Sequence, residues 1–395
     1  MLVVGAGPAG LRCALRLAGA GVDVVLCGDE PTEPYDRVAL GQILAGRAQP
    51  RDLVTYSAER LHALGVDFRP GTRIVDIDLP TGRARTAGGE AVAWDRLVLA
   101  TGSEAIRLPV PGADLEGVFV YRRLADVLAL RRRVVPGLRA VVIGGGLLGL
   151  EAAGALAGHG ARVTVVHAAP WPMERQLDAG AGDLLARALR ARFGIHFVMP
   201  ATTSAIEGES AVRLVRLADG TRLPAELVVM AVGVRPETTL ARSAGLPVDR
   251  GIRVDGAMRT SAAGIFAIGE CAEHDGVVCG LVAPALAMAE VAAEAILGGP
   301  ARYAPKPTPA TLKVAGIGVW SAGAIAPPQA ETILLRDDGS GTYRRLWLRD
   351  GRAVGAVLVG DTSDAPFFLD LVAAERDVAH RRHTVLFGPA FQEAA

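Results

Sequence analysis

Two short apolar runs in the sequence are each followed by a glycine-rich turn and then by a longer segment rich in alanine and leucine. A short apolar run before such a turn predicts a buried β-strand, and the longer segment predicts a helix. Each predicted helix stops at a glycine, and another apolar run follows, at 22–27 in the first copy and at 161–166 in the second. The sequence therefore repeats a strand–turn–helix–strand unit with an offset of 139 residues.

Both turns have the pattern GxGxxG. In such a turn the first glycine allows a tight bend, the second lets the backbone approach a pyrophosphate, and the third lets the helix pack on the strand. The start of the helix then offers N–H groups to the phosphates. Two such units predict two dinucleotide sites, which suits a flavin and a nicotinamide; the alternative is two packing turns without a ligand. The residues expected to line the turns are Gly5, Gly7, Ala9 and Gly10 in the first copy and Gly144, Gly146, Leu147, Leu148 and Gly149 in the second.

The position that contacts the adenosine ribose differs between the two copies. An acidic residue normally ends the second strand and accepts the ribose hydroxyls. In the first copy Asp29 and Glu30 follow the strand at once, whereas in the second copy the position holds His167, and no acid occurs before Glu174. Without that carboxylate, His167 or Arg175 is free to meet a 2′-phosphate, so the sequence favours NADPH while NADH stays open. The alternative is that His167 is only tolerated at a strand end.

Further segments outline the domains of the chain. An apolar strand at 97–100 leads into Thr101-Gly102, and another at 264–268 leads into Gly269-Glu270, ahead of a helical stretch at 281–297. A proline-rich break at 300–309 precedes short predicted strands at 343–348 and 353–359, with a hairpin turn at 337–341. We expect an α/β fold with two Rossmann-like dinucleotide-binding domains and a smaller α+β C-terminal domain. The expected boundaries are 1–107 with 237–305 for the flavin domain, 108–236 for the nicotinamide domain, and 306–395 for a C-terminal interface domain.

Composition narrows the classes of function. Lys plus Arg and Asp plus Glu both number 42, a balance that argues against nucleic-acid and polybasic membrane binding. The four cysteines form no CxxC pair, so we expect no disulfide scaffold and no metal or iron–sulfur site, and redox chemistry would need an organic cofactor. Because no apolar stretch is long enough to span a membrane and the chain opens on a predicted strand, we expect a cytoplasmic protein. Three arginines at 131–133 are expected on a solvated helix end.

One resemblance is carried jointly by several stretches of the sequence: 35–40, 118–122, 142–155, 176–178, 267–272, 280–284 and 355–364. The chain resembles the two-dinucleotide flavoprotein reductases of the glutathione-reductase type, and within them the rubredoxin and putidaredoxin reductases. It is most similar to the FAD- and NAD(P)H-binding half of the large subunit of assimilatory NAD(P)H nitrite reductase. The rubredoxin and putidaredoxin reductases usually continue with Ser-Lys after the leucine that matches Leu40, where this chain has Gly41-Gln42.

The resemblance implies roles for particular residues. Thr101, Gly102 and Glu270 would line FAD together with the first glycine turn, and Arg37 would serve the flavin or its pyrophosphate. Ala283 would stand at the start of the helix that faces the flavin. Glu151 would meet the nicotinamide carboxamide, and Gly233 would close the nicotinamide site.

The resemblance also implies a function. We expect an FAD-dependent NAD(P)H oxidoreductase that passes electrons to a separate ferredoxin-type iron–sulfur protein or sirohaem subunit, and that is a monomer or homodimer. The disulfide-reductase branch is excluded because 37–46 contains no cysteine. Two alternatives stay open: direct reduction of a small organic or nitrogenous acceptor, and a non-catalytic, nucleotide-responsive interaction protein.

Overall fold

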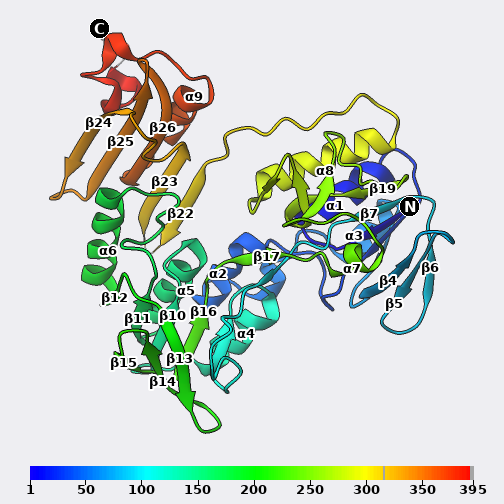
Figure 1. Ribbon diagram of the computed structural model, residues 1–395, viewed down its shortest axis with the longest axis horizontal. Coiled ribbons are helices and arrows are strands. Elements are labelled where there is room, and N and C mark those ends of the chain that lie inside the picture. Colours follow the sequence, from blue (N-terminus) through cyan, green and yellow to red (C-terminus); the bar gives the residue numbers. More distant parts are fainter. Residues whose placement is uncertain (315, 392–395) are drawn as a thin grey trace. The chain divides into compact units, whose positions relative to one another are not determined.

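The computed structural model describes residues 1–314 and 316–391 and divides the chain into two compact units (Figure 1). The first unit consists of residues 1–39, 48–104 and 234–306. The second unit consists of residues 40–47, 105–233 and the described residues from 307 onward. Each unit contains one of the two GxGxxG turns.

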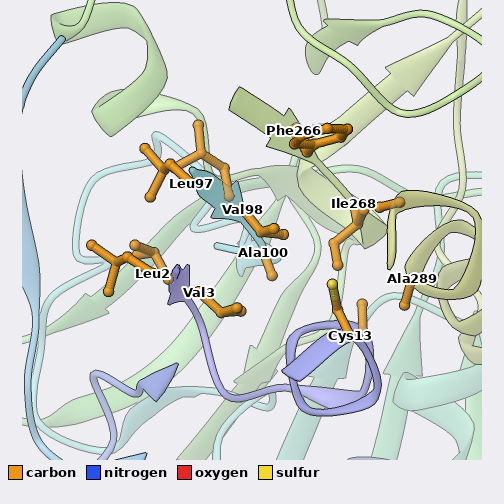
Figure 2. Close-up of a cluster of buried hydrophobic side chains, with 14 of the residues drawn as sticks. Leu2, Val3, Cys13, Leu97, Val98, Ala100, Phe266, Ile268 and Ala289 are labelled. Carbon is orange, nitrogen blue, oxygen red and sulfur yellow. The ribbon is translucent and has the colours of Figure 1, made fainter. Parts of the chain in front are cut away.

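The first unit is built on a five-stranded parallel sheet. Its order is β19 (Ile265–Ala267), β7 (Leu97–Leu99), β1 (Leu2–Val4), β2 (Val24–Cys27) and β3 (Val66–Arg69). Helix α1 (Pro8–Ala18) presents Leu11, Ala14 and Leu17 to the core at helical spacing. Apolar side chains from strands and helices, including Leu2, Leu97, Phe266 and Ala289, form this core (Figure 2). The polar side of α1 pairs with helix α8 (Val282–Ile296) through Arg12 and Glu290 at 3.1 Å.

The sheet of the second unit has the same plan. It is parallel, in the order β12 (His196–Val198), β11 (Arg162–Val166), β10 (Arg139–Ile143), β16 (Leu227–Met230) and β9 (Val118–Val120). Each unit adds a three-stranded antiparallel ribbon, β4 (Ile74–Asp78), β5 (Arg83–Thr86) and β6 (Ala91–Ala93) in the first and β13 (Thr203–Gly208), β14 (Val212–Leu217) and β15 (Arg222–Pro224) in the second. The longer helices that accompany this parallel sheet are α4 (Leu124–Arg133), α5 (Leu147–Gly158) and α6 (Ala179–Phe193).

The C-terminal part of the second unit is an antiparallel sheet with one helix on it. Its strands run in the order β22 (Ala310–Val314), β23 (Ile317–Gly323), β26 (Arg352–Gly360), β25 (Thr342–Arg349) and β24 (Glu331–Asp337). Side chains alternate along β25 with period two. Leu346 and Leu348 point into a core with helix α9 (Ala365–Ala373), whereas Tyr343 and Arg345 on the opposite face reach Asp178 at the start of α6.

The remaining elements are short. The α-helices are α2 (Leu40–Leu44), α3 (Ala58–Ala63) and α7 (Thr239–Ser243). The strands are β8 (Ser103–Ala105), β17 (Val234–Pro236), β18 (Ile252–Val254), β20 (Ala272–His274) and β21 (Val277–Val278). The 3₁₀ turns are η1 (Arg37–Ala39), η2 (Pro50–Leu53), η3 (Gly269–Cys271), η4 (Ala379–Arg381), η5 (Val385–Phe387) and η6 (Pro389–Phe391).

The expected fold class is confirmed: an α/β chain with two dinucleotide-binding folds and a C-terminal α+β part. Locally, Arg131, Arg132 and Arg133 form the last turn of α4, and the turn at 337–341 joins β24 to β25. Trp320 and Trp347 are buried in the C-terminal part, as expected for core aromatics. No helix among the described residues is long and apolar enough to cross a membrane.

Candidate functional site

The first glycine turn is crowded at its first and last glycines and open at its middle glycine. Gly5 has a φ of +111°, and a Cβ on it would lie 2.1 Å from the carbonyl oxygen of Ala100. A Cβ on Gly10 would lie 1.8 Å from the carbonyl oxygen of Gly5, so strand and helix meet here at backbone distance. A Cβ on Gly7, by contrast, meets nothing within 4 Å. The open side of Gly7 is therefore where a ligand can approach the backbone.

The second glycine turn repeats this geometry. A Cβ on Gly144, at a φ of +113°, would lie 2.2 Å from the carbonyl oxygen of Ala231, and one on Gly149 would lie 1.9 Å from that of Gly144. A Cβ on Gly146 meets nothing within 4 Å. The open side of the turn thus lies at the middle glycine in both copies.

Backbone hydrogen bonds fix the two turns in the same way. The N–H of Gly5 donates to the carbonyl of Cys27, and that of Gly144 donates to the carbonyl of Val166, each at 2.8 Å. Helices α1 and α5 both begin without a side-chain cap and without an acidic residue in the first turn. Their N-terminal N–H groups, and the positive end of each helix dipole, suit an anion such as a pyrophosphate. Both turns therefore fit a dinucleotide.

The other turn residues lie in the first turns of these helices. Ala9 is buried and belongs to α1. Leu147 is half-buried and Leu148 is exposed, and both belong to α5. All the residues expected at the two turns are therefore brought together there, four around the first and five around the second.

The acid expected at the first ribose position is held by two neighbours. Glu30 accepts hydrogen bonds from the Tyr35 hydroxyl at 2.8 Å and from Arg37 Nη2 at 2.6 Å. The Arg37 guanidinium also lies 5.2 Å from the centre of the Tyr35 ring, a cation–π contact. Asp29 is exposed next to Glu30. Arg37 is thus placed as a partner of Glu30 at the carboxyl end of β2, a contact that residue type alone did not reveal.

The turn Ala100-Thr101-Gly102, which follows β7, is hydrogen-bonded to other parts of the first unit. The hydroxyl of Thr101 donates to the carbonyl of Glu237 at 2.6 Å, and the N–H of Glu237 donates to the carbonyl of Gly102 at 2.9 Å. The next residue, Ser103, donates to Oε2 of Glu270 at 2.7 Å. Glu270 lies three residues after the end of β19, which is the neighbour of β7, so both strand ends reach the same edge of the sheet. Ala283 stands exposed in the first turn of α8.

In the second unit, Glu151 lies on α5 two residues after the glycine turn. Burial raises the pKa of Glu151 to about 7. A Cβ on Gly41 of α2 would lie 3.4 Å from the Tyr121 hydroxyl and 3.6 Å from Oε2 of Glu151. That hydroxyl is buried without a hydrogen-bond partner among the described residues, and burial followed by the Glu151 charge raises the pKa of Tyr121. The pair is a partly desolvated acid beside a phenol, a setting typical of functional sites.

At the position predicted to contact the second ribose, the side chains of His167 and Glu174 contact each other. The Gly145 N–H donates to Nδ1 of His167 at 3.1 Å, and Nε2 of His167 lies 2.9 Å from Oε2 of Glu174. Arg175 follows and is exposed. Gly233, with a φ of +112°, follows β16 and accepts a hydrogen bond from the N–H of Ile106 at 3.0 Å. Sequence reasoning missed the contact between Glu174 and His167; the only signal was an acid seven residues further along.

The thiols do not gather into a reactive group. Cys13, Cys27 and Cys271 are buried, and Cys279 is half-buried. Burial raises the pKa of each of these four thiols. Within the described ranges, no cluster of three or more His, Cys, Asp or Glu side chains is placed to hold a metal ion.

The paired turns and the two parallel sheets define a protein that holds two dinucleotides. Residues 1–295 match the family model described as pyridine nucleotide-disulphide oxidoreductase, and residues 309–376 match the rubredoxin NAD+ reductase C-terminal domain. The chain belongs to the pyridine nucleotide-disulphide oxidoreductase family, whose members are FAD- and NAD(P)H-binding reductases.

Three known proteins illustrate the similarity. The assimilatory nitrate reductase electron transfer subunit and the nitrite reductase [NAD(P)H] of Bacillus subtilis (strain 168) are both 37% identical, over 99% and 100% of this chain. The matches cover 52% and 49% of those proteins, so the chain spans about half their length. The crystal structure of a ferredoxin reductase from Rhodopseudomonas palustris has a TM-score of 0.91 and 28% identity, covering 100% of this chain and 99% of that one. The expected resemblance to nitrite reductase and to electron-transfer reductases is confirmed.

Proposed function

We propose that this chain takes a hydride from NAD(P)H and, with FAD as its resident cofactor, delivers electrons to a separate iron–sulfur protein. The observation that supports this proposal is the duplicated glycine turn, which is crowded at Gly5 and Gly144 and open at Gly7 and Gly146. When bound, FAD accepts a hydride and releases electrons one at a time, which nicotinamide does not do.

The proposed FAD site is the turn of the first unit, within a flavin domain of residues 1–107 and 237–305. The N–H groups at the start of α1 hold the pyrophosphate, and Glu30, with Asp29 beside it, takes the ribose. Arg37 neutralises Glu30 and keeps its carboxylate oriented. Thr101, Gly102 and Glu270 form the wall at the carboxyl ends of β7 and β19, and the start of α8 at Ala283 directs its positive dipole end to developing negative charge.

The proposed coenzyme site is the turn of the second unit, within residues 108–236. Gly144, Gly146 and Gly149 shape the cradle, and Leu147 and Leu148 supply N–H groups at the start of α5. Glu151, which holds its proton up to near neutral pH, positions the carboxamide of the nicotinamide by hydrogen bonding. Gly233 leaves room where the chain passes the end of β16, and 306–395 is proposed as an interface domain.

The names of two relatives support the proposed acceptor. One similar protein is an electron transfer subunit and another is a ferredoxin reductase, and both names describe delivery of electrons to another component. We therefore propose a ferredoxin-type protein or a sirohaem-containing subunit as the partner of this chain. Electron-transfer contacts are small and rely on charge, so association is expected to weaken with salt.

A matched pair of variants tests the assignment of the two sites. Gly7→Val places a side chain in the open space of the first turn, and Gly146→Val does the same in the second. We expect Gly7→Val to fold without retaining FAD, measured by visible absorption after reconstitution. We expect Gly146→Val to retain FAD that NAD(P)H no longer bleaches. If Gly146→Val loses the flavin and Gly7→Val retains it, the two sites are assigned the wrong way round.

The acceptor is tested by steady-state oxidation of NAD(P)H with ferredoxin, rubredoxin and small organic or nitrogenous acceptors over a range of salt concentrations. Rapid reduction of at least one iron–sulfur protein, slowed by salt, is the expected result. Slow reduction of every protein carrier together with rapid reduction of a small molecule would instead show a direct reductase.

A further inference from the structure

The loop that follows β11 folds back onto the second glycine turn. The N–H of Met173 donates to the carbonyl of Gly145 at 3.0 Å, and the N–H groups of Gln176 and Leu177 both donate to the carbonyl of Met173 at 2.8 Å. Met173 itself is buried, with a φ of 55°. These bonds fix the chain around Met173, so Glu174 lies beside the turn although it is eight residues away from the end of β11 at Val166.

Both ring nitrogens of His167 are engaged by this arrangement. The Gly145 N–H can only donate, so Nδ1 is the acceptor and the ring proton lies on Nε2. Nε2 then donates to Oε2 of Glu174 at 2.9 Å. A Cβ on Gly145 would lie 2.9 Å from Cγ of His167, so the imidazole packs directly on the turn. His167 thus connects the turn to the Glu174 carboxylate, and its nitrogens are not available to a 2′-phosphate.

The Glu174 side chain keeps contact with solvent. It is 35% exposed, whereas the His167 side chain is 10% exposed. The carboxylate therefore lies at the rim of the site, held through one oxygen by His167. In a Rossmann fold the end of the second strand, here Val166-His167, lies beside the adenosine ribose, where a carboxylate accepts the 2′- and 3′-hydroxyls and repels a 2′-phosphate.

We propose that Glu174, oriented by His167, is the carboxylate that reads the adenosine ribose in the second dinucleotide site and makes NADH the preferred coenzyme. The proposal rests on the function proposed above and replaces the preference for NADPH that the sequence favoured. His167 is a positioning residue: it holds the carboxylate and does not contact the ribose. The acid is supplied by a folded loop in place of the strand end.

Arg175 is the competing feature, because an exposed guanidinium beside the ribose would attract a 2′-phosphate. Glu174 is held to the turn by His167, and this bond fixes its position. If Arg175 controlled the choice, NADPH would be preferred and Arg175→Ala would abolish that preference. With Glu174 in control, Arg175→Ala leaves the preference for NADH in place.

The test measures binding of adenosine fragments to the full chain by titration calorimetry, without any turnover. The probes are 5′-AMP and adenosine 2′,5′-bisphosphate, which differ only in the 2′-phosphate. We expect the wild-type chain to prefer 5′-AMP by about tenfold or more, the size of one charge-assisted hydrogen bond with the repulsion added. Glu174→Gln should bring the two affinities to within about threefold, and Glu174→Asp should keep most of the preference because the charge remains.

Two further variants complete the design. Glu209→Gln makes the same chemical change at an exposed acid of the same unit and should leave the ratio unchanged. His167→Ala should lower the ratio in the same direction, and its effect should not add to that of Glu174→Gln because both act through one carboxylate. With NADH and NADPH as substrates, the change should appear in KM and not in kcat.

The outcomes separate this proposal from the proposed function. A wild-type preference for the 2′-phosphate, or a ratio that Glu174→Gln does not change, overturns the role of Glu174 while leaving the reductase assignment intact. Failure of the wild-type chain to bind either fragment or either coenzyme overturns the proposed function itself.

Discussion

The hydroxyl of Tyr343 donates a 2.6 Å hydrogen bond to Oδ2 of Asp178, a residue 165 positions earlier in the chain. Asp178 is buried at the start of α6, and Tyr343 is buried on β25. Burial raises the pKa of Tyr343 to about 12, so its hydroxyl remains a donor at neutral pH. Arg345 Nη1 donates to the same oxygen at 2.8 Å. The C-terminal sheet is thus attached to α6 by a buried carboxylate with two donors.

Removing either side of this attachment should destabilise the second unit. Tyr343→Phe deletes one hydrogen bond and should cost about 1–2 kcal/mol. Asp178→Ala should cost more, about 3 kcal/mol, because it leaves the half-buried Arg345 without its counter-charge. Urea denaturation measures both. Tyr303→Phe is the matched control, since its edge-on packing against His274 at 5.3 Å survives the change. Equal effects of Tyr343→Phe and Tyr303→Phe would show that the bond contributes nothing.

Glu151 should make stability depend on pH. The pKa of about 7 in the folded chain lies above the ordinary glutamate value of 4.5, so the folded chain binds more protons than the unfolded chain between these pH values. The stabilisation from holding this proton is complete below pH 4.5 and is lost as the pH rises through 7. The loss is on the order of 3 kcal/mol.

The variant Glu151→Gln isolates this effect. It should remove the fall in stability between about pH 5 and pH 8, measured by urea denaturation at both values. Glu209→Gln, at an exposed acid of the same unit, should leave the fall unchanged. An unaltered pH dependence in Glu151→Gln would mean that this carboxyl titrates normally.

The glycines of the first turn should separate into two classes. Gly5→Ala brings a Cβ to 2.1 Å from a backbone oxygen at a φ of +111°, so we expect the flavin-free protein to lose about 2 kcal/mol or more. Gly7→Ala meets open space and should leave the flavin-free protein within about 0.5 kcal/mol of wild type. Thermal melting of both apoproteins measures this. A Gly7→Ala variant as unstable as Gly5→Ala would contradict the open geometry.

No cysteine is expected to take part in electron transfer. Replacing all four with serine or alanine should cost on the order of 1 kcal/mol at each buried position, while bleaching of the flavin by NAD(P)H continues. Stopped-flow absorption on the folded variants provides the measurement. A folded Cys271 or Cys279 variant whose flavin is no longer reduced would refute this.

Local features of the molecule were readable from the sequence. Both glycine turns depend on residues within ten positions of each other, and the helix expected at 281–297 is observed at Val282–Ile296. The strand expected at 353–359 is observed at Arg352–Gly360. It could be predicted because its apolar run and the turns on either side of it are contiguous in the sequence.

Contacts between residues that lie far apart in the sequence could not be predicted from it. The sequence favoured NADPH because no acid stands near the strand end, and it could not show that a loop folds back and brings Glu174 to 2.9 Å from His167. Asp178 and Tyr343 lie far apart in the chain, and only the face of β25 on which Tyr343 lies could be inferred from period two. The desolvation of Glu151 likewise depends on the packing of α2 against α5, which no local pattern specifies.

The burial of the thiols makes the protein a poor target for oxidants. With a pKa of about 12, Cys13 exists as thiolate in only about one part in 10⁵ at neutral pH, and Cys27, at about 11, in one part in 10⁴. Peroxides attack the thiolate form of a cysteine and not the thiol. Their low thiolate content should therefore protect Cys13 and Cys27 from peroxide, including any that the proposed reductase activity would form in aerated solution.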